Sequence, residues 1–306
     1  MTDYAKEYFD RHAQAWVAQA YVGDRLPPRF PVGPERLRVA VESVAPAVGT
    51  DGTLVDLGCG GGQLLTHAAR LGWRAVGVDV APGMVEEARR ATEGLAVRLI
   101  EAAYDESGLP SGRADAVTAL GLIEYLPEDA GLLAEAHRLL RPDGRFAVSC
   151  RNRLYNLLSA NAYTERELTG GTALALLDEL RGTLEGVEAS DVNALAHELA
   201  SAATDLARAV ELDNADDEAP TRDHPATFAE ERRQHSPGEL RRSAEAAGLV
   251  GVALFPVHPH PLPPVTESVA PRVYNRLALA WQRALGGRPL GLAFCTAFVA
   301  TFEKRR

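Results

Sequence analysis

The sequence is poor in cysteine, methionine and aromatic residues. Its 306 residues include 3 Cys and 2 Met, and Phe, Trp and Tyr together make up 6% of the chain. Cys59, Cys150 and Cys295 lie far apart, so their spacing matches neither a disulfide framework nor a zinc site. We therefore expect a protein of a reducing compartment, the cytoplasm, with no bound metal.

Long apolar runs and excess basic charge are also missing. No apolar run reaches the length of about 18 residues that a membrane span needs, and the first residues lack a signal-peptide core. The net charge of −10 argues against a nucleic-acid partner, because phosphate binding needs a basic surface. Apolar residues make up 46% of the chain, which is typical of a folded globular protein.

One segment of the sequence is rich in glycine and lies between two acidic residues. Leu54–Gly62 reads Leu-Val-Asp-Leu-Gly-Cys-Gly-Gly-Gly, and a second apolar run ends at Asp79. This pattern predicts a strand, a tight turn, a helix and a second strand. Glycines let the backbone approach a ligand closely, and an acid ending the second strand accepts hydrogen bonds from ribose hydroxyls. The unit therefore predicts binding of an adenosine-type cofactor.

The glycine spacing argues against a dinucleotide. The third glycine of Gly-x-Gly-x-x-Gly is missing after Gly62, and a carboxylate at Asp56 would repel a pyrophosphate while suiting a cation. The segment instead resembles the first motif of class I S-adenosylmethionine-dependent methyltransferases, Asp-x-Gly-x-Gly-x-Gly. The residues that carry the likeness are Asp56, Gly58, Cys59, Gly60 and Gly62.

The resemblance extends beyond this motif. Residues 105–110 and 139–144 are similar to further stretches of the same family, and the likeness covers residues 50–150 well and 235–303 loosely. It implies S-adenosyl-L-methionine as cofactor and S-adenosyl-L-homocysteine as product. It also implies a doubly wound, Rossmann-like α/β fold with a seven-strand, mostly parallel sheet of order 3-2-1-4-5-7-6, in which strand 7 is antiparallel.

Hydrophobic patterning and turn signals predict the individual elements. Strands are expected at Thr53–Leu57, Arg74–Asp79, Ala96–Ala102, Ala114–Leu120, Arg145–Cys150, Leu249–Phe255 and Leu292–Phe302. Helices are expected at about 4–20, 35–45, 63–71, 82–92, 128–140, 172–184, 191–212, 236–247 and 272–285. Alternating strands and helices imply parallel pairing with right-handed crossovers.

These elements divide the chain into three parts. Residues 1–150 hold N-terminal helices and the first part of the cofactor-binding core, and residues 235–306 complete that core, with an insertion at 256–290. Residues 151–234 contain no convincing strand and include an acidic, turn-like stretch at 214–223. The family resemblance implies that this insertion is a helical cap that forms the acceptor pocket.

The expected cofactor contacts follow from the motif and the strand ends. Asp56 is expected to face the sulfonium, Asp79 the ribose and Asp105 the adenine. Met84 fits an adenine contact and core packing about equally well. The full set of expected cofactor residues is Asp56, Gly58, Cys59, Gly60, Gly62, Asp79, Val80, Met84, Tyr104, Asp105, Leu120, Gly121, and Tyr8 and Tyr21 from an N-terminal lid.

The expected acceptor side follows from chain connectivity. Strand ends share one edge of the sheet, so His235, His258 and His260 are expected to converge there, with at least one acting as general base. Hydrogen-bonded structural roles are the alternative for each ring. Substrate contacts are expected from Tyr125, Arg151, Asn152 and Tyr155, and an arginine at this place suits a carboxylate or phosphate on the acceptor.

The sequence thus predicts an enzyme that transfers a methyl group to a small molecule, with no nucleic-acid or membrane partner. The candidate histidine bases favour an oxygen acceptor, on a secondary metabolite or a sugar-like intermediate. An N-methyltransferase or a macromolecule methyltransferase of the same fold remains an alternative. A catalytically inactive cofactor-binding protein is a further alternative, against which the intact glycine turn and acids argue.

Overall fold

The computed structural model describes residues 2–21, 29–215 and 231–305. Seven strands form one sheet, in the order β3-β2-β1-β4-β5-β7-β6. Their bounds are β1 Thr53–Leu57, β2 Arg74–Asp79, β3 Val97–Glu101, β4 Ala114–Leu120, β5 Leu140–Arg151, β6 Leu249–Pro259 and β7 Cys295–Lys304. Strand β7 runs antiparallel to β5 and β6, and the other pairs are parallel. The expected fold class and strand order are confirmed.

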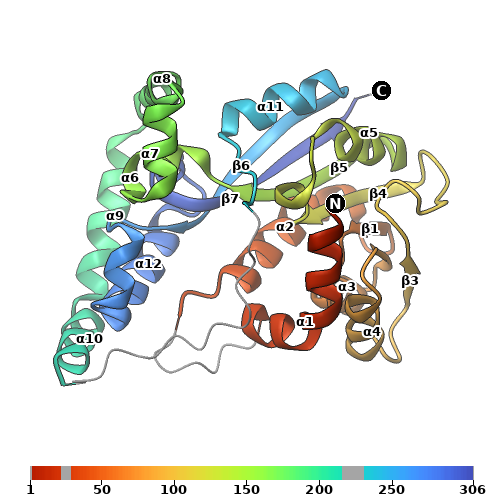
Figure 1. Cartoon of the computed structure of the whole chain (residues 1–306), viewed down its shortest axis with the longest axis horizontal. Helices are drawn as coiled ribbons and strands as arrows, with labels where there is room; N and C mark the ends of the chain where they lie inside the picture. Colours follow the sequence, from red (N-terminus) through yellow and green to blue (C-terminus); the bar gives the residue numbers. More distant parts are fainter. Residues whose placement is uncertain (1, 22–28, 216–230, 306) are drawn as a thin grey trace.

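Helices cover both faces of the sheet (Figure 1). Those of the core are α1 Asp3–Tyr21, α2 Val32–Val48, α3 Gln63–Arg70, α4 Pro82–Ala91, α5 Ala130–Leu139 and α11 Pro237–Ala246. The remaining ones are α6 Asn156–Ser159, α7 Ala162–Thr169, α8 Ala173–Glu185, α9 Ala189–Ser201, α10 Ala203–Ala215, α12 Pro271–Leu285 and α13 Pro289–Phe294. Short 3-10 turns lie at η1 Ile123–Tyr125, η2 Arg153–Tyr155 and η3 Pro264–Ser268.

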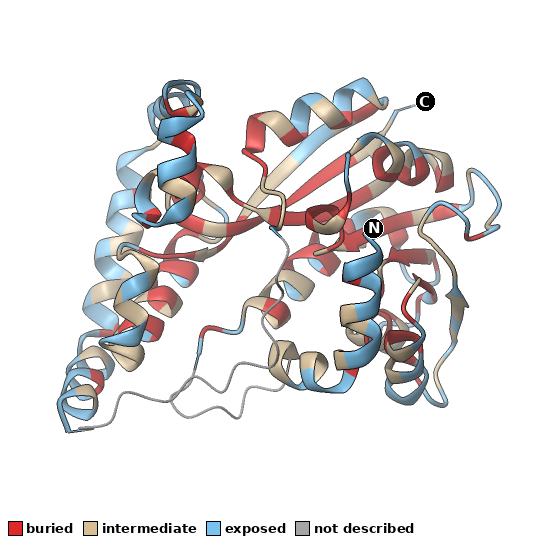
Figure 2. Cartoon of the chain, in the orientation of Figure 1, coloured by how far each residue is buried: buried red, intermediate tan, exposed pale blue. Residues whose placement is uncertain are grey.

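The sheet is the buried centre of the molecule (Figure 2). On one face Phe146 and Phe298 pack with α5 and α11, and on the other Leu54 packs with Val44 of α2 and with α3. Local sequence explains where helices start: Ser236 caps α11 by accepting from the Glu239 N–H at 3.1 Å, and Pro237 follows at the first helical position. In the described part of the chain, no helix is long and apolar enough to cross a membrane.

The helical insertion after β5 lies over the β6–β7 side of the sheet. Helices α9 and α10 pack on α12, and α8 packs on α13, so the group stands beside the sheet's far edge (Figure 1). The single helix expected at 191–212 is two helices, α9 and α10, and α6, α7 and α13 were not predicted. Within the acidic stretch expected at 214–223, residues 216–223 lie outside the described residues.

Three predicted strand bounds are wrong. Strand β5 begins at Leu140, so the expected turn at 141–144 lies within it. Strand β6 continues to Pro259, through part of the segment expected as a loop. Because β6 is an edge strand that pairs only with β7, its prolines need no second partner for the missing N–H. Strand β7 starts at Cys295, because the preceding six residues form α13.

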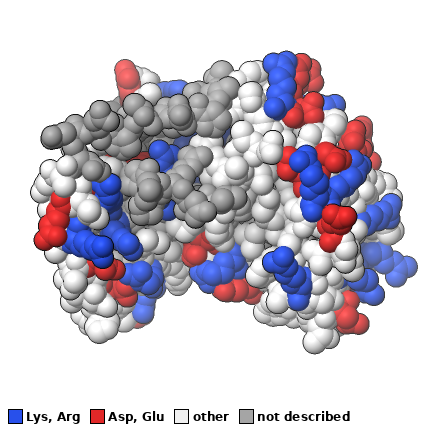
Figure 3. All heavy atoms as spheres, turned by 90° about the horizontal axis from the view of Figure 1, so that it is seen from below, with Lys and Arg blue, Asp and Glu red and all other residues white. Residues whose placement is uncertain are grey.

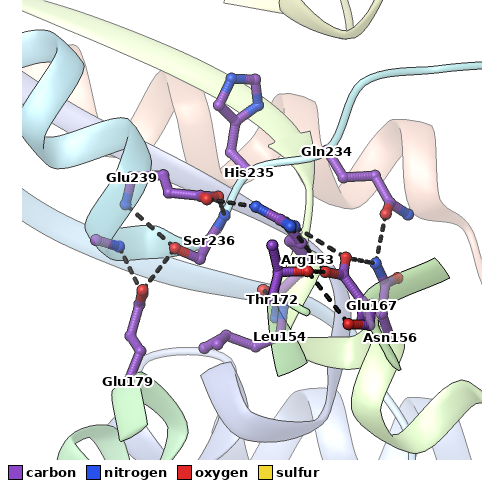
Figure 4. A network of polar contacts seen from close by, with 12 residues as sticks. Arg153, Leu154, Asn156, Glu167, Thr172, Glu179, Gln234, His235, Ser236 and Glu239 are labelled. Carbon is purple, nitrogen blue, oxygen red and sulfur yellow. Dashed lines mark hydrogen bonds and ion pairs between the residues drawn. The ribbon is translucent and has the colours of Figure 1, made fainter. Parts of the chain in front are cut away.

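A polar network joins the insertion to the core (Figure 4). Arg153 donates to both carboxylate oxygens of Glu167, at 2.9 and 2.7 Å, and to Glu239 of α11 at 2.5 Å. Asn156 adds a 2.9 Å bond to Glu167. Although burial opposes it, the hydrogen bonds from Arg153, Thr172 and Asn156 lower the pKa of Glu167 to about 2. This joint holds the first helices of the insertion against the start of α11.

Candidate active site

The glycine turn follows β1 and lies at the carboxyl edge of the sheet. Gly58, Gly60 and Gly62 have φ values of 70°, 51° and 79°, which side chains with a Cβ rarely adopt. The N–H groups of Gly58 and Cys59 donate to the Val78 carbonyl oxygen at 2.8 and 3.1 Å, which ties the turn to β2. A Cβ built on Gly60 meets no protein atom within 4 Å, so the space beside this backbone is free for a ligand.

Asp79 is fixed beside this turn at the end of β2. One carboxylate oxygen accepts from the Gly60 N–H at 2.8 Å, and the other accepts from the Ala81 N–H at 3.0 Å. Burial raises the pKa of Asp79, and the backbone hydrogen bonds from Ala81, Gly60 and Val80 oppose that rise. Each oxygen keeps a lone pair for a ligand hydroxyl, as a ribose contact requires.

A pocket of about 250 Å³ opens between the ends of β1, β2 and β4 and the helix α1. It contains most of the expected cofactor residues and also Tyr125, which was expected to contact the acceptor. Its lining is Thr2, Asp3, Lys6, Phe9, Trp16, Gly58, Gly60, Val78, Asp79, Val80, Met84, Ala102, Ala103, Tyr104, Leu120, Gly121, Leu122 and Tyr125.

Six expected cofactor residues are not part of this lining: Asp56, Cys59, Gly62, Asp105, Tyr8 and Tyr21. Asp56 is buried and accepts a 2.7 Å hydrogen bond from Thr118 on β4, instead of facing the pocket. Burial raises the pKa of Asp56 to about 7, and the nearby Asp79 adds to the rise. A Cβ on Gly62 would lie 3.1 Å from Ala88, so this glycine serves the packing of α3 on α4.

Helix α1, which was expected to form a lid, borders the pocket through side chains other than the expected ones. Phe9 and Trp16, seven residues apart on one helix face, line the pocket where Tyr8 and Tyr21 were expected. The Phe9 ring contacts the Tyr125 ring edge-on, with centroids 5.0 Å apart. The spacing of Phe9 and Trp16 was visible in the sequence, but nothing local showed which face of the helix is turned inward.

His258 and His260 belong to the packing between β6 and α12. The His258 ring stacks on Phe30 with centroids 4.6 Å apart, and burial lowers its pKa to about 3. His260 lies 2.7 Å from the Tyr274 carbonyl oxygen through Nε2 and accepts from the Leu262 N–H through Nδ1. Neither ring lines the pocket. Their expected role on the acceptor side stays a prediction.

His235 also lies outside the lining of the pocket. Its Nε2 is 2.9 Å from Asp129 at the start of α5, and its ring points away from the polar network around Arg153 (Figure 4). Although burial opposes it, contacts with His235 and Arg233 lower the pKa of Asp129 to about 2. The ring therefore anchors the chain before α11 to α5, whereas the rings of His258 and His260 lie together, with centroids 6.0 Å apart.

Two of the expected substrate residues, Asn152 and Tyr155, hydrogen-bond to backbone carbonyl oxygens. The Asn152 amide donates to the carbonyl oxygens of Leu292 and Cys295 at 2.8 and 3.0 Å, and the side chain is 1% exposed. Tyr155 donates to the Leu262 carbonyl oxygen at 3.0 Å. Both side chains fix α13 and the loop after β6 to the end of β5.

Arg36 and Glu124, two charged residues that the sequence analysis did not single out, lie at the edge of the pocket. A Cβ built on Gly121, which lines the pocket, would lie 3.3 Å from Arg36 Nη1 and 3.8 Å from Glu124 Oε1. Glu124 is buried, with 6% exposure. Its place just past the end of β4 was a usable signal, whereas Arg36 comes from α2 and carries no local one. Among the described residues, no three His, Cys, Asp or Glu side chains are grouped to hold a metal ion.

Comparison with known proteins agrees with this geometry. Residues 55–148 match the family model of the methyltransferase domain. With the strand order and the glycine turn, this match shows that the chain carries a class I S-adenosylmethionine-dependent methyltransferase domain.

Individual relatives match only part of the chain. The chain is 33% identical over 103 residues to a ubiquinone biosynthesis O-methyltransferase of Xanthomonas oryzae pv. oryzae, which covers 33% of this chain and 43% of the relative. The chain thus spans about half the length of the curated relatives it matches.

Solved structures extend the likeness in fold to the whole chain. One is a chain in the complex between the Haloferax volcanii Trm112 methyltransferase activator and a methyltransferase, with TM-score 0.56, 15% identity and coverage of 100% and 99% of the two chains. Another is the 1,6-didemethyltoxoflavin-N1-methyltransferase of Burkholderia thailandensis with bound S-adenosylhomocysteine, with TM-score 0.51, 16% identity and coverage of 99% and 88%.

Proposed function

We propose that this protein transfers the methyl group of S-adenosyl-L-methionine to an oxygen atom of a small-molecule acceptor. The observation that carries the proposal is the Asp79 carboxylate, which is held by the Gly60 and Ala81 N–H groups at the mouth of a pocket beside the glycine turn. The choice of oxygen is supported by the name of the matched relatives, which are O-methyltransferases. We further propose that the acceptor is a secondary metabolite or a sugar-like intermediate.

The pocket residues fit such a cofactor. Asp79 suits the ribose hydroxyls, and the bare backbone at Gly58 and Gly60 permits close contact. Met84 and Tyr104 suit the adenine and are both part of the lining. When bound, the cofactor supplies a methyl group already activated by its sulfonium, so the protein's task is alignment and exclusion of water.

The apolar lid serves that exclusion. Phe9, Trp16 and Leu122 line the pocket together with Tyr125. Burial and the neighbouring Glu124 raise the pKa of Tyr125 to about 12, so its hydroxyl stays protonated at neutral pH. The buried carboxylate of Glu124, at the same edge, replaces the histidines as the proposed proton acceptor for an acceptor hydroxyl.

Charge distribution and thiol state support the rest of the proposal. On the face shown in Figure 3, basic and acidic side chains are interspersed, as suits a small molecule better than a nucleic acid. All three cysteines are buried and free, in keeping with a cytoplasmic protein. We propose that the helical insertion contributes to the acceptor pocket through α7, since Arg151 lies 5.8 Å from the centroid of the Tyr163 ring.

The test is methyl transfer itself. The protein is incubated with methyl-labelled S-adenosylmethionine and a panel of phenols, hydroxy acids, sugars and amines, and products are screened for a gain of one methyl. We expect product from a hydroxyl compound, at least tenfold less product with Asp79→Ala, and wild-type yield with Asp178→Ala, an exposed acid of α8. Transfer to amines alone would overturn the oxygen assignment, and no transfer with any acceptor would overturn the proposal.

A further inference from the structure

Three arginines from distant parts of the chain meet at the edge of the pocket. Arg36 of α2 reaches Gly121, Arg151 ends β5, and Arg232 hydrogen-bonds the hydroxyl of Tyr125. Tyr125 also lies within electrostatic range of Arg36. All three guanidinium groups therefore lie within electrostatic range of Tyr125 in the short turn η1, and Tyr125 lines the cofactor pocket.

Backbone hydrogen bonds fix this meeting. The Arg233 N–H donates to the Glu124 carbonyl oxygen at 3.0 Å, which places Arg232 beside η1. Two residues later, the His235 N–H donates to the Arg151 carbonyl oxygen, also at 3.0 Å. One short segment thus bridges η1 and the end of β5 and brings Arg232 and Arg151 together. The cluster is built into the fold and is not a chance meeting of exposed side chains.

The cluster lacks matching negative charge among the residues the structure describes. The Nε atoms of Arg36 and Arg151 are buried without a hydrogen-bond partner, and neither side chain forms an ion pair there. Burial, and next the neighbouring Arg232, lower the pKa of Arg151 from its usual value, whereas Glu124 opposes that change. Glu124 supplies one negative charge against three positive ones.

Among the described residues, Asp129 is an acid near this segment that is already paired. Asp129 lies 2.9 Å from both Arg233 and His235, so it is not free to neutralise the cluster. An unpaired buried charge or polar atom costs free energy, and native proteins pair such groups or keep them for a ligand. Arg181 on α8 shows the ordinary case, since its side chain is 67% exposed and lies between two acidic neighbours.

We propose that Arg36, Arg151 and Arg232 bind an anionic group of the acceptor, a carboxylate or a phosphoryl group. Guanidinium groups suit both anions, because their fixed forks of N–H donors match two oxygens at once. Since Arg36 Nη1 lies 3.3 Å from the point where a Cβ on Gly121 would stand, the anion is held at the pocket edge and the rest of the acceptor lies toward Tyr125. This inference rests on the proposed function, whose acceptor class it narrows to small anions.

The test uses anions of defined chemistry and needs no knowledge of the acceptor. Benzoate, phenyl phosphate and neutral benzamide are titrated by calorimetry, at constant ionic strength, into the wild-type protein saturated with S-adenosylhomocysteine. The variants are Arg36→Gln and Arg151→Gln, with Arg151→Lys to keep the charge and lose the fork. The control is Arg181→Gln, which removes the same charge from an exposed helix. A separate titration with S-adenosylhomocysteine checks each variant's fold and cofactor site.

We expect at least one anion to bind saturably, and benzamide to bind at least tenfold more weakly. Arg36→Gln and Arg151→Gln should each weaken anion binding about tenfold or more, Arg151→Lys less, and Arg181→Gln not at all. Tighter binding of benzoate identifies a carboxylate, and tighter binding of phenyl phosphate a phosphoryl group. Equal binding of anion and benzamide, or anion binding unchanged in Arg36→Gln or Arg151→Gln, would overturn the inference. Failure of S-adenosylhomocysteine to bind the wild-type protein would instead overturn the proposed function.

Discussion

Arg151, the last residue of β5, and Arg153, the first residue of η2, stand two residues apart and have opposite surroundings. Arg153 makes three hydrogen bonds to two carboxylates, Glu167 and Glu239. Arg151 has no acidic partner among the described residues, and its Nε is buried and unpaired. The first arrangement is that of a structural joint, since every charge is matched within the protein. The second is that of a binding site, since its charge is matched only when a ligand arrives.

The largest expected effect on stability comes from removing Arg153, whose charge is matched by carboxylates. Arg153→Ala leaves the buried Glu167 carboxylate without its main partner, so we expect a loss of about 3–5 kcal/mol in the free energy of unfolding. Urea denaturation measures this change. Arg181→Ala, at an exposed ion pair, should change the same quantity by less than about 0.5 kcal/mol. Equal stability of the two variants would show that the joint is not a structural element.

Changes near the unpaired arginines should affect turnover more than stability. Glu124→Gln keeps the shape of the side chain but removes the proposed proton acceptor, so we expect turnover of a hydroxyl acceptor to fall about 10²-fold. The affinity for S-adenosylhomocysteine should stay unchanged, because Glu124 is not part of the pocket lining. Full turnover in this variant would leave alignment as the protein's main contribution.

Asp56 is a buried acid without a cationic partner among the residues that the structure describes, and we expect it to make the stability of the protein depend on pH. Its pKa is about 7 in the folded protein against 3.8 ordinarily, because it is buried. The folded state therefore holds this proton more tightly, and stability falls as the pH rises from about 4 to about 7. Asp56→Asn removes that fall. We expect the variant to be more stable than the wild type by on the order of 1–3 kcal/mol at about pH 8, and equally stable at about pH 4.

The pH dependence of Asp56 can be measured by urea denaturation of the wild type and Asp56→Asn from about pH 4 to about pH 8. If the difference in unfolding free energy between the wild type and Asp56→Asn does not change with pH, the Asp56 carboxyl titrates normally and is not buried as described.

The smallest expected effect on stability is that of Arg151→Gln. Arg151→Gln removes a buried charge that has no ionic partner within the described residues, so stability should change by less than about 1 kcal/mol or rise slightly. Urea denaturation beside Arg153→Ala gives the contrast directly. A loss for Arg151→Gln as large as that for Arg153→Ala would mean that Arg151 also serves the fold.

The glycine turn and the acid beside it could be predicted from the sequence, because local sequence determines local structure there. Positive φ at Gly58, Gly60 and Gly62 demands glycine, and an acid at the end of the next strand is visible as Asp79. The first five strand positions followed from hydrophobic patterning, although β5 starts earlier than expected, whereas the strand order came from the family resemblance. These features need no knowledge of distant packing.

The surroundings of the histidines and of Arg36 could not be predicted from the sequence, because they depend on contacts between distant elements. Connectivity correctly brought the main chain of His235 beside Arg151, but not the direction of the ring, which Asp129 determines. His258 and His260 turn toward Phe30 and α12, helix contacts that no local pattern encodes. Arg36 lies more than a hundred residues before Arg151, so only the folded chain shows that they belong to one cluster.

The most direct test of the account is calorimetric titration of S-adenosylhomocysteine into the wild-type protein, Asp79→Ala and Asp178→Ala. The account predicts saturable one-to-one binding to the wild type, a loss of about 1.5–3 kcal/mol of binding free energy in Asp79→Ala, and no change in the exposed-acid control. Absence of binding to the wild type, or equal affinity in a folded Asp79→Ala, would contradict the assignment of the pocket beside the glycine turn.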